Sequence, residues 1–264
     1  MNPCSLIPST VCGLLLLVSL GGCAQTRNHD FSPPPGGETV SVTVKVPKDL
    51  AADTMRVMYR SEKCPLTRSD GSGGRYEIDG AHAIEVVPQR QGQSDLYQAQ
   101  LPRDGGGTCQ WKLSNVTFGV HYQNTARFGE NVLPGGGGGV IVIFDDNQPQ
   151  QRSLLEDPEE VSGDLLIRKN YYPWVDEQFL IRHEKRAWLL GDDDIFITYK
   201  AIHAKNVIFE PYLHTNSVVY SVGPKIKKDG NYTQITYPDG TAIADGSSEP
   251  SFEKLEAIRL GRGQ

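Results

Sequence analysis

The positions of five cysteines predict more chemistry than any other residues of this chain. The chain has 264 residues and a formal net charge of −6. Cys4 and Cys12 lie in an apolar N-terminal segment, Cys23 closes that segment, and Cys64 and Cys109 lie farther along. A thiol in a protein can be discarded with a leader, acylated, paired or bound to a metal, so each position has to be assigned one of these roles.

The segment 1–22 has the pattern of a secretory signal peptide. Val11 to Leu20 is rich in Val and Leu and is followed by two glycines. An apolar run of about 10 residues is too short to span a bilayer, which takes roughly 20. A short apolar core before small residues is typical of a cleaved signal. Residues 1–26 lack the Lys or Arg of an ordinary signal, which a misplaced start or a weakly charged leader would explain. The alternative is a buried hydrophobic helix of a cytosolic protein.

The segment Leu20-Gly21-Gly22-Cys23 resembles a bacterial lipobox. The resemblance implies that Cys23 carries a lipid and becomes the first residue of the mature chain. Ala24 follows it in place of the Asp that tends to retain such lipoproteins in the inner membrane. We therefore expect a cell-envelope protein that is anchored by lipid in the outer membrane and faces the periplasm.

Cys64 and Cys109 are expected to form a disulfide, since an oxidising periplasm lets disulfides persist. The bridge would close about 45 residues and contribute roughly 4 kcal/mol at most. Cys64 follows a strand-like run, and Cys109 precedes another. The alternatives are two buried thiols or two metal ligands, but a zinc site takes four closely spaced ligands and the sequence has no CxxC or HxxxH pair.

Motifs of enzymes and cofactor sites are missing from the sequence. The glycine run Gly135 to Gly139 is followed by an apolar strand and no lysine, so it predicts a flexible hairpin or loop tip rather than a phosphate loop. No Gly-x-Ser-x-Gly elbow is present. Asp192, Asp193 and Asp194 could bind calcium, although a solvated turn is the expected role because the EF-hand spacing is missing. We expect no catalytic activity, no metal and no cofactor.

One aromatic segment is the candidate binding surface. It combines large aromatic side chains with carboxylates, and Tyr and Trp are enriched in protein-binding hot spots. Its candidate residues are Tyr171, Tyr172, Trp174, Asp176 and Glu177, with Asp192, Asp193 and Asp194 as an acidic rim. The alternative, which the sequence favours slightly, is that Tyr172 and Trp174 pack between two halves of the protein.

Alternating apolar and polar residues predict a mainly all-β chain with two sandwich-like halves. The expected strands are Val40–Val46, Met55–Arg60, Ile84–Val87, Trp111–Tyr122, Val140–Phe144, Leu165–Ile167, Phe179–His183, Ala187–Leu190, Ile195–Tyr199, Asn206–Phe209, Val218–Val222 and Ile235–Tyr237. Phe252, Leu255 and Ile258 have helical spacing after Pro250, which predicts one short C-terminal helix.

Composition divides the rest of the chain. Residues 23–38 contain Pro33-Pro34-Pro35-Gly36-Gly37 and are expected to be a tether. Residues 39–146 are expected to form an Ig-like β-sandwich with the disulfide, and 164–264 a second β-rich half. Between them, 147–163 is either an acidic linker or a long loop inside one domain. A sequence pI near 5.5 argues against nucleic acid as a partner and against adhesion to anionic head groups, so the lipid anchor is the expected membrane contact.

Three segments resemble bacterial lipoproteins associated with type VI secretion, specifically immunity proteins against antibacterial phospholipase effectors. They are Met55-Arg56-Val57-Met58-Tyr59-Arg60-Ser61, Leu113-Ser114-Asn115-Val116-Thr117-Phe118-Gly119-Val120 and Tyr220-Ser221-Val222-Gly223-Pro224-Lys225. The resemblance implies a secreted phospholipase as partner and inhibition by occlusion. A membrane tether would raise the inhibitor's effective concentration at the surface under attack. The alternatives are a structural or assembly lipoprotein without a toxin partner, and a ligand-binding or enzymatic lipoprotein whose site is built from scattered residues.

Overall fold

The protein is mainly β-structure in two sheets. The structure is a computed structural model that describes residues 30–149, 157–192 and 196–262. One short helix near the C-terminus, α1 (Phe252–Arg259), follows the strands. The Ser251 hydroxyl caps it by accepting a hydrogen bond from the Lys254 amide. The predicted fold class and the predicted C-terminal helix are confirmed.

The first sheet has eight strands in the order β11-β14-β10-β8-β3-β4, with β2 and β7 also paired to β8. Its strands are β2 (Leu50–Ala52), β3 (Met55–Ser69), β4 (Arg75–Val86), β7 (Asp104–Gly106), β8 (Trp111–Tyr122), β10 (Gly139–Ile143), β11 (Glu159–Glu160) and β14 (Phe196–Lys200). A 3-10 turn, η1 (Ala126–Phe128), follows β8.

The second sheet has ten strands in the order β18-β17-β16-β12-β15-β1-β6-β5, and β13 joins β12 to β9 at one side. Its strands are β1 (Thr39–Lys45), β5 (Gln89–Arg90), β6 (Leu96–Pro102), β9 (Val132–Pro134), β12 (Leu165–Gln178), β13 (Glu184–Leu190), β15 (Asn206–Leu213), β16 (Val219–Val222), β17 (Gln234–Thr236) and β18 (Ala242–Ile243).

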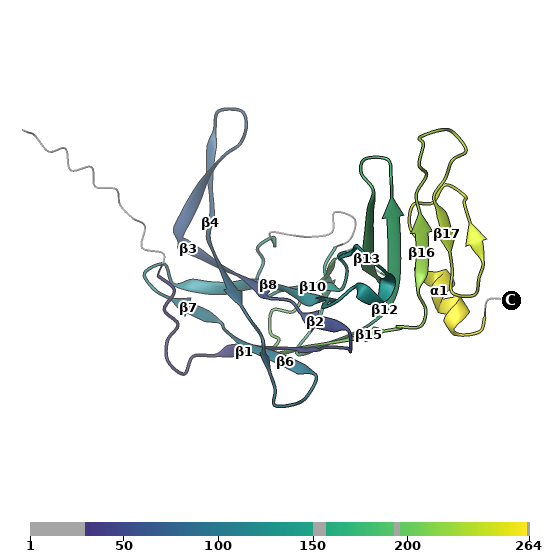
Figure 1. Cartoon of the computed structure of the whole chain (residues 1–264). Coiled ribbons are helices and arrows are strands. Elements are labelled where there is room, and N and C mark those ends of the chain that lie inside the picture. Colours follow the sequence, from purple (N-terminus) through teal and green to yellow (C-terminus); the bar gives the residue numbers. More distant parts are fainter. Residues whose placement is uncertain (1–29, 150–156, 193–195, 263–264) are drawn as a thin grey trace, which may run out of the picture.

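The main core lies between the two sheets. Val40, Val42 and Val44 alternate along β1 and point into it, as the sequence predicts. From the other sheet, Phe118 meets Phe209 with ring centroids 6.2 Å apart. Figure 1 shows β1, β6 and β15 as a layer below β8 and β10. The arrangement is a sandwich in which each sheet turns an apolar face inward, toward the other sheet.

Strands from both predicted halves share each sheet, which corrects the predicted division at 147–163. Within the second sheet, β1 pairs in parallel with β15. Within the first, β10 pairs in parallel with β14. Parallel pairing joins segments that are far apart in the chain, whereas an Ig-like sandwich is antiparallel. The Ig-like prediction for 39–146 is therefore wrong in topology, and 147–163 connects strands of one sandwich; its residues 150–156 lie outside the described ranges.

Strand β12 extends beyond the main sandwich and carries a second, smaller core. Its first part pairs with β15 up to Tyr171, and its last part pairs with β16 from Trp174. Pro173, which has no amide hydrogen to donate, lies where the parallel partner changes. The second core comprises the buried side chains of Tyr172, Val219, Ile235, Tyr237 and Leu255.

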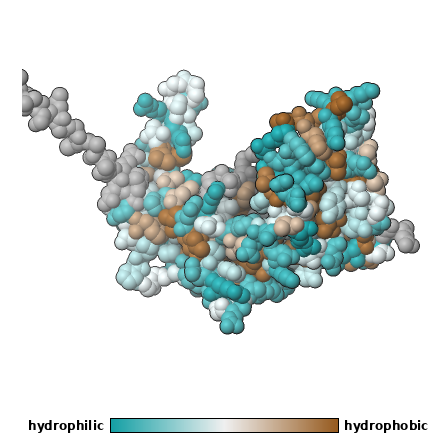
Figure 2. All heavy atoms as spheres, in the orientation of Figure 1, coloured by the Kyte–Doolittle hydropathy of each residue, from teal (hydrophilic) through white to brown (hydrophobic). Residues whose placement is uncertain are grey.

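The predicted strand at Phe179–His183 is wrong, because these residues form the turn between β12 and β13. Strand β12, which precedes this turn, is longer than the predicted strand Leu165–Ile167. The prediction was too short because Pro173 and mixed polarity interrupt the alternation along β12. In Figure 1, the β12–β13 hairpin projects in the same direction as the β3–β4 hairpin at the other end of the molecule. Figure 2 shows a hollow between these two projections.

The described part of the predicted tether is attached to the sandwich. The Phe31 ring packs 4.7 Å from the Tyr59 ring, and the Ser32 amide donates a hydrogen bond of 2.9 Å to the Gly105 carbonyl. Gly106, at φ 61°, allows this contact, because a Cβ there would lie 2.0 Å from the Ser32 carbonyl oxygen. The prediction of a free tether is corrected for residues 30–38, since the segment includes an aromatic side chain that it can bury.

Candidate functional site

The predicted disulfide is present. Cys64 and Cys109 are bonded, with their Cα atoms 5.5 Å apart. Cys64 lies inside β3, close to the register shift between Ser61 and Leu66, rather than beyond the end of a strand. The bond connects this irregular part of β3 to the turn before β8. It therefore fixes the base of the β3–β4 hairpin to the sandwich.

The strongest candidate site lies on one face of β12, β13 and β16. Along β12, Tyr171 and Val175 point into the main core. Residues with the opposite parity, Trp174 and Asp176 among them, point to the other face. The cross-strand register places Trp188 opposite Trp174 and Arg186 opposite Asp176. The register of the β12–β13 hairpin thereby brings aromatic and charged side chains together.

Two cavities next to Trp188 open on this face. Their volumes are about 360 Å³ and about 280 Å³, and both are lined by Asp176, Gln178 and Trp188. Trp174 lines the smaller cavity, and Arg186 lines the larger. We call the two cavities together the tryptophan cleft. Pockets that combine aromatic walls with a few fixed polar groups are typical of binding sites.

Asp176 is the polar centre of the tryptophan cleft. It is buried, with 6% of its surface exposed. Its Oδ1 accepts a hydrogen bond of 2.6 Å from the Ser221 hydroxyl, and its Oδ2 accepts one of 2.7 Å from the Gln178 amide. The Ser221 hydroxyl in turn accepts a hydrogen bond of 2.7 Å from Trp174 Nε1. These bonds hold the carboxylate and the Trp174 ring in fixed orientations.

The Ser221 hydroxyl lies between an indole ring and a carboxylate. The hydrogen-bond partners of the Ser221 hydroxyl are Trp174 and Asp176.

The glycine run forms one wall of the cleft instead of the predicted flexible loop tip. The Gly135 amide donates to the Ala187 carbonyl over 2.7 Å, and the Leu189 amide donates to the Gly136 carbonyl over 3.0 Å. A Cβ on Gly135 would lie 2.6 Å from Trp188 Cδ2. The absence of a side chain therefore lets the indole lie against the backbone. The Trp174 and Trp188 rings are stacked at 5.9 Å between centroids.

Two of the predicted partner-binding residues are core residues. Tyr171 belongs to the main core and Tyr172 to the smaller one, and neither offers a surface to a partner. Burial, together with a hydrogen bond to Glu256, raises the pKa of Tyr172 to about 12. Its hydroxyl also accepts a hydrogen bond from Arg259. The alternative of inter-element packing describes these tyrosines, whereas Trp174 and Asp176 line the cleft.

The predicted acidic residues are only partly brought together. Glu177 pairs with His183, 2.7 Å between Oε1 and Nε2, and with Lys185. The hydrogen bond from His183 is the main reason that the pKa of Glu177 is lowered. Asp192 pairs with Lys169 at 3.2 Å. Asp193, Asp194 and Cys23 lie outside the described residues, as does the signal segment 1–22.

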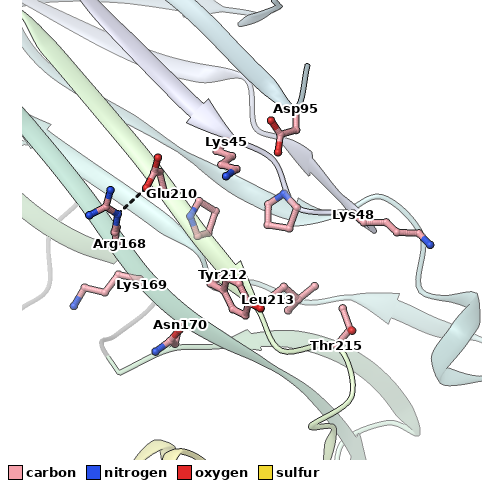
Figure 3. A pocket seen from close by; sticks show the side chains of 12 residues that line it. Lys45, Lys48, Asp95, Arg168, Lys169, Asn170, Glu210, Tyr212, Leu213 and Thr215 are labelled. Atoms are coloured by element: carbon pink, nitrogen blue, oxygen red, sulfur yellow. Dashed lines mark hydrogen bonds and ion pairs between the residues drawn. The ribbon is translucent and has the colours of Figure 1, made fainter. Parts of the chain in front are cut away.

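A larger cavity, of about 610 Å³, lies on the outer side of β1, β12 and β15, and Figure 3 shows the side chains that line it. Lys45, Lys48, Arg168 and Lys169 line it together with Asp95 and Glu210. Arg168 Nε donates a hydrogen bond of 2.7 Å to Glu210, which neutralises part of this charge. Tyr212, 63% exposed, is its aromatic group. The groove is mildly basic and offers a second surface to a partner.

Searches for metal sites and membrane spans gave no candidates in the described part of the chain. No group of three His, Cys, Asp or Glu side chains there is arranged to hold a metal ion. No helix in those ranges has the length and apolar character needed to cross a bilayer.

Half of the tryptophan cleft has no signal in the sequence. Trp188, Ser221 and Gln178 lie in short strands or at strand ends, where nothing in the local pattern marks them. The cross-strand register brings Trp188 and Ser221 to Trp174 and Asp176, whereas Gln178 reaches Asp176 from two residues farther along β12. Comparison with protein-family models, with curated proteins and with solved structures finds no match to this chain.

Proposed function

We propose that this chain is a lipid-anchored periplasmic protein that binds another protein, an antibacterial phospholipase delivered by type VI secretion, and inhibits it by occlusion. The partner class comes from the resemblance of three sequence segments. Two of those segments, in β3 and β8, are paired neighbours at the centre of the first sheet. Most of their apolar side chains belong to the main core, so the resemblance concerns the scaffold more than the binding face.

The tryptophan cleft is the observation that carries the binding proposal. Its two indole rings are held before any partner arrives, Trp174 by Ser221 and Trp188 by contact with Gly135. Rigid aromatic side chains lose little entropy on binding, and Trp and Arg dominate protein-binding hot spots. Arg186 adds a guanidinium to the same cavity wall.

An unpartnered donor also supports a binding role for the cleft. Trp188 Nε1 is buried without a hydrogen-bond partner in the described ranges. Leaving a buried donor unpaired costs about 1–3 kcal/mol, and such groups call for an explanation. A partner that shifted the Trp188 ring slightly could offer it an acceptor.

The test is an affinity capture from the native host. The full chain, oxidised and tagged at the C-terminus, would be used as bait, and the eluted proteins identified by mass spectrometry. We expect one phospholipase at near-equal stoichiometry, and equimolar chain should abolish its hydrolysis of phospholipid vesicles. Recovery of envelope scaffold proteins alone, or of nothing, would reject the proposal and favour a structural or assembly lipoprotein.

Three variants would identify the binding face. Trp188→Ala removes the wall shared by both cavities, Tyr212→Ala alters the basic groove, and Tyr76→Ala removes a 51% exposed aromatic from the β3–β4 hairpin. We expect only Trp188→Ala to weaken binding, by about 10-fold or more, as is usual for a hot-spot residue. If Tyr212→Ala alone weakened binding, the basic groove of Figure 3 would be the partner site.

A further inference from the structure

Two adjacent loops form one projecting end of the molecule. They are the β12–β13 turn, residues 179–183, and the connection between β16 and β17, residues 223–233. The Gly223 amide donates to the Glu177 carbonyl over 2.8 Å, and Lys225 Nζ lies 5.2 Å from the centre of the Phe179 ring. These contacts fix the two loops side by side, at the upper right in Figure 1.

Four aliphatic side chains are exposed at this end, and we call them the apolar tip. Their exposed fractions are 98% for Ile181, 68% for Ile226, 50% for Leu180 and 42% for Val222. Figure 2 shows hydrophobic atoms at the top of the same part of the molecule. Full burial of one such side chain would contribute about 1.5–3 kcal/mol. An isolated chain that exposes four such side chains on one projection therefore loses this stabilisation at each of them.

A projecting turn does not need aliphatic side chains, as the β3–β4 hairpin demonstrates. Its turn, residues 69–75, consists of Ser, Asp, Gly and Arg. Asp70 accepts hydrogen bonds from the Ser72 and Gly74 amides, which closes that turn without apolar contacts. The aliphatic character of the other projection is thus specific to it.

The charge around the apolar tip is opposite to that of the whole chain. The segments 177–185 and 222–229 contain the cations Arg182, Lys185, Lys225, Lys227 and Lys228 and the carboxylates Glu177, Glu184 and Asp229. Two of those carboxylates are engaged by cations, Glu177 by Lys185 and Glu184 by Arg182. The tip is locally cationic although the formal net charge of the chain is −6.

We propose that the apolar tip docks on an anionic lipid bilayer surface. Exposed aliphatic side chains flanked by lysines fit the boundary between acyl chains and anionic head groups, because the aliphatic groups enter the apolar region and the ammonium groups stay with the phosphates. Each Lys near such a surface contributes about 1 kcal/mol. The most exposed apolar side chains of this end, Ile181 and Ile226, are aliphatic, whereas Trp, Tyr and Arg dominate protein-binding hot spots.

This inference goes beyond the proposed function and does not depend on the identity of the protein partner. It also replaces the expectation, drawn from overall charge, that the lipid anchor is the sole membrane contact. Ile181 and Arg182 line the larger cavity of the tryptophan cleft. Docking of the tip would therefore hold the cleft next to the lipid surface on which a phospholipase acts.

The experiment is hydrogen–deuterium exchange of the full chain bound to vesicles. Anionic vesicles of phosphatidylglycerol and phosphatidylethanolamine would be compared with vesicles of phosphatidylcholine. We expect amide exchange at 179–183 and 224–230 to be about 10-fold slower on the anionic vesicles, since docking must be reversed before exchange. The amides of 69–75 should exchange equally on both and serve as the internal control.

Variants separate docking of the tip from other effects. Ile181→Ser combined with Ile226→Ser should remove the protection, and Lys227→Gln combined with Lys228→Gln should reduce it. The matched control is Val87→Ser, at a 62% exposed aliphatic outside the tip, which should keep the protection. Equal exchange on both vesicle types, or protection that survives the isoleucine variants, would overturn the proposal. Neither result bears on capture of a protein partner, so the two proposals fail separately.

Discussion

The hydroxyl of Ser221 donates a hydrogen bond of 2.6 Å to the buried carboxylate of Asp176 across the parallel pair β12–β16. The same hydroxyl accepts from Trp174, so one small side chain holds both a charge and an indole ring. A buried carboxylate is costly unless it is hydrogen-bonded. The stability of this strand pair and the shape of the tryptophan cleft therefore depend on the same residue.

Replacement of Ser221 by alanine should destabilise the protein by about 1–3 kcal/mol, because Asp176 and Trp174 each lose a hydrogen-bond partner. Denaturant unfolding, followed by tryptophan fluorescence, measures this change. Ser72→Ala, in the exposed β3–β4 turn, is the control and should change the unfolding free energy by less than about 0.5 kcal/mol. Equal unfolding free energies of the two variants would mean that the hydrogen bonds of Ser221 contribute nothing to stability.

Gly135→Ala should displace the Trp188 ring, because the new Cβ would lie 2.6 Å from Trp188 Cδ2 and 2.8 Å from the Ala187 carbonyl oxygen. We expect a loss of about 1–3 kcal/mol from overpacking, a changed tryptophan emission spectrum and weaker partner binding. Gly223→Ala is the control, since its Cβ would meet the Glu177 carbonyl oxygen at an ordinary 3.4 Å. An unchanged emission spectrum in Gly135→Ala would contradict the packing described for Trp188.

Loss of the disulfide should lower the unfolding free energy by up to about 4 kcal/mol, the chain-entropy value for the loop that it closes. The comparison is between the oxidised chain and the double variant Cys64→Ser, Cys109→Ser in denaturant. A reducing agent should destabilise the oxidised protein and leave the double variant unchanged. If both responded alike, the effect would come from other thiols.

His214 should make stability depend on pH below neutrality. Its ring stacks on Tyr172 at 4.8 Å and contacts Tyr212, and its Nε2 lies 3.0 Å from the Asn170 side-chain oxygen. Burial, and then the nearby charge of Arg259, lowers the pKa of His214, which Glu256 opposes weakly. The unfolded chain then binds a proton more readily than the folded one, so stability is present above the unfolded pKa near 6.5 and falls as pH decreases from there.

The check for His214 is the difference in unfolding free energy between pH 7.5 and pH 5.5. This difference should be smaller in His214→Gln than in the unaltered chain. The comparison variant is His121→Gln, whose unfolding free energy is measured at the same two pH values. His121 lies in the first sheet and pairs with Asp53. A pH dependence identical in the His214→Gln variant and the unaltered chain would exclude the proposed origin.

Local patterns in the sequence predicted the strands well and their partners poorly. The alternation of Val40, Val42 and Val44 identifies a strand with one buried face, and the structure has it. The same alternation cannot say that β1 pairs with β15, because strand pairing is non-local and depends on the register of distant segments. The predicted separation into two halves failed for this reason.

One part of the cleft could be predicted from local composition, whereas the other part depends on a contact between distant segments. Trp174 and Asp176 stand in a segment whose composition is unusual, and the sequence marks them. Trp188 is a lone aromatic in a short strand, and Gly135 belongs to a run that is typical of loops. Their roles arise from one contact, in which the missing side chain of the glycine makes room for the indole, and no local pattern encodes that contact.

The attachment of Phe31 and Ser32 beneath Gly106 limits how far the folded body can move from an anchor at Cys23. Only six residues, 24–29, separate such an anchor from Asp30. At about 3.6 Å for each step of fully extended chain, the reach is at most about 25 Å. The body would therefore lie close to its own membrane and be confined to a narrow range of orientations. Gly106→Ala should detach Phe31 and Ser32 from the sandwich and so lengthen the connection to the anchor. Faster protease cleavage within residues 31–37 would measure this detachment.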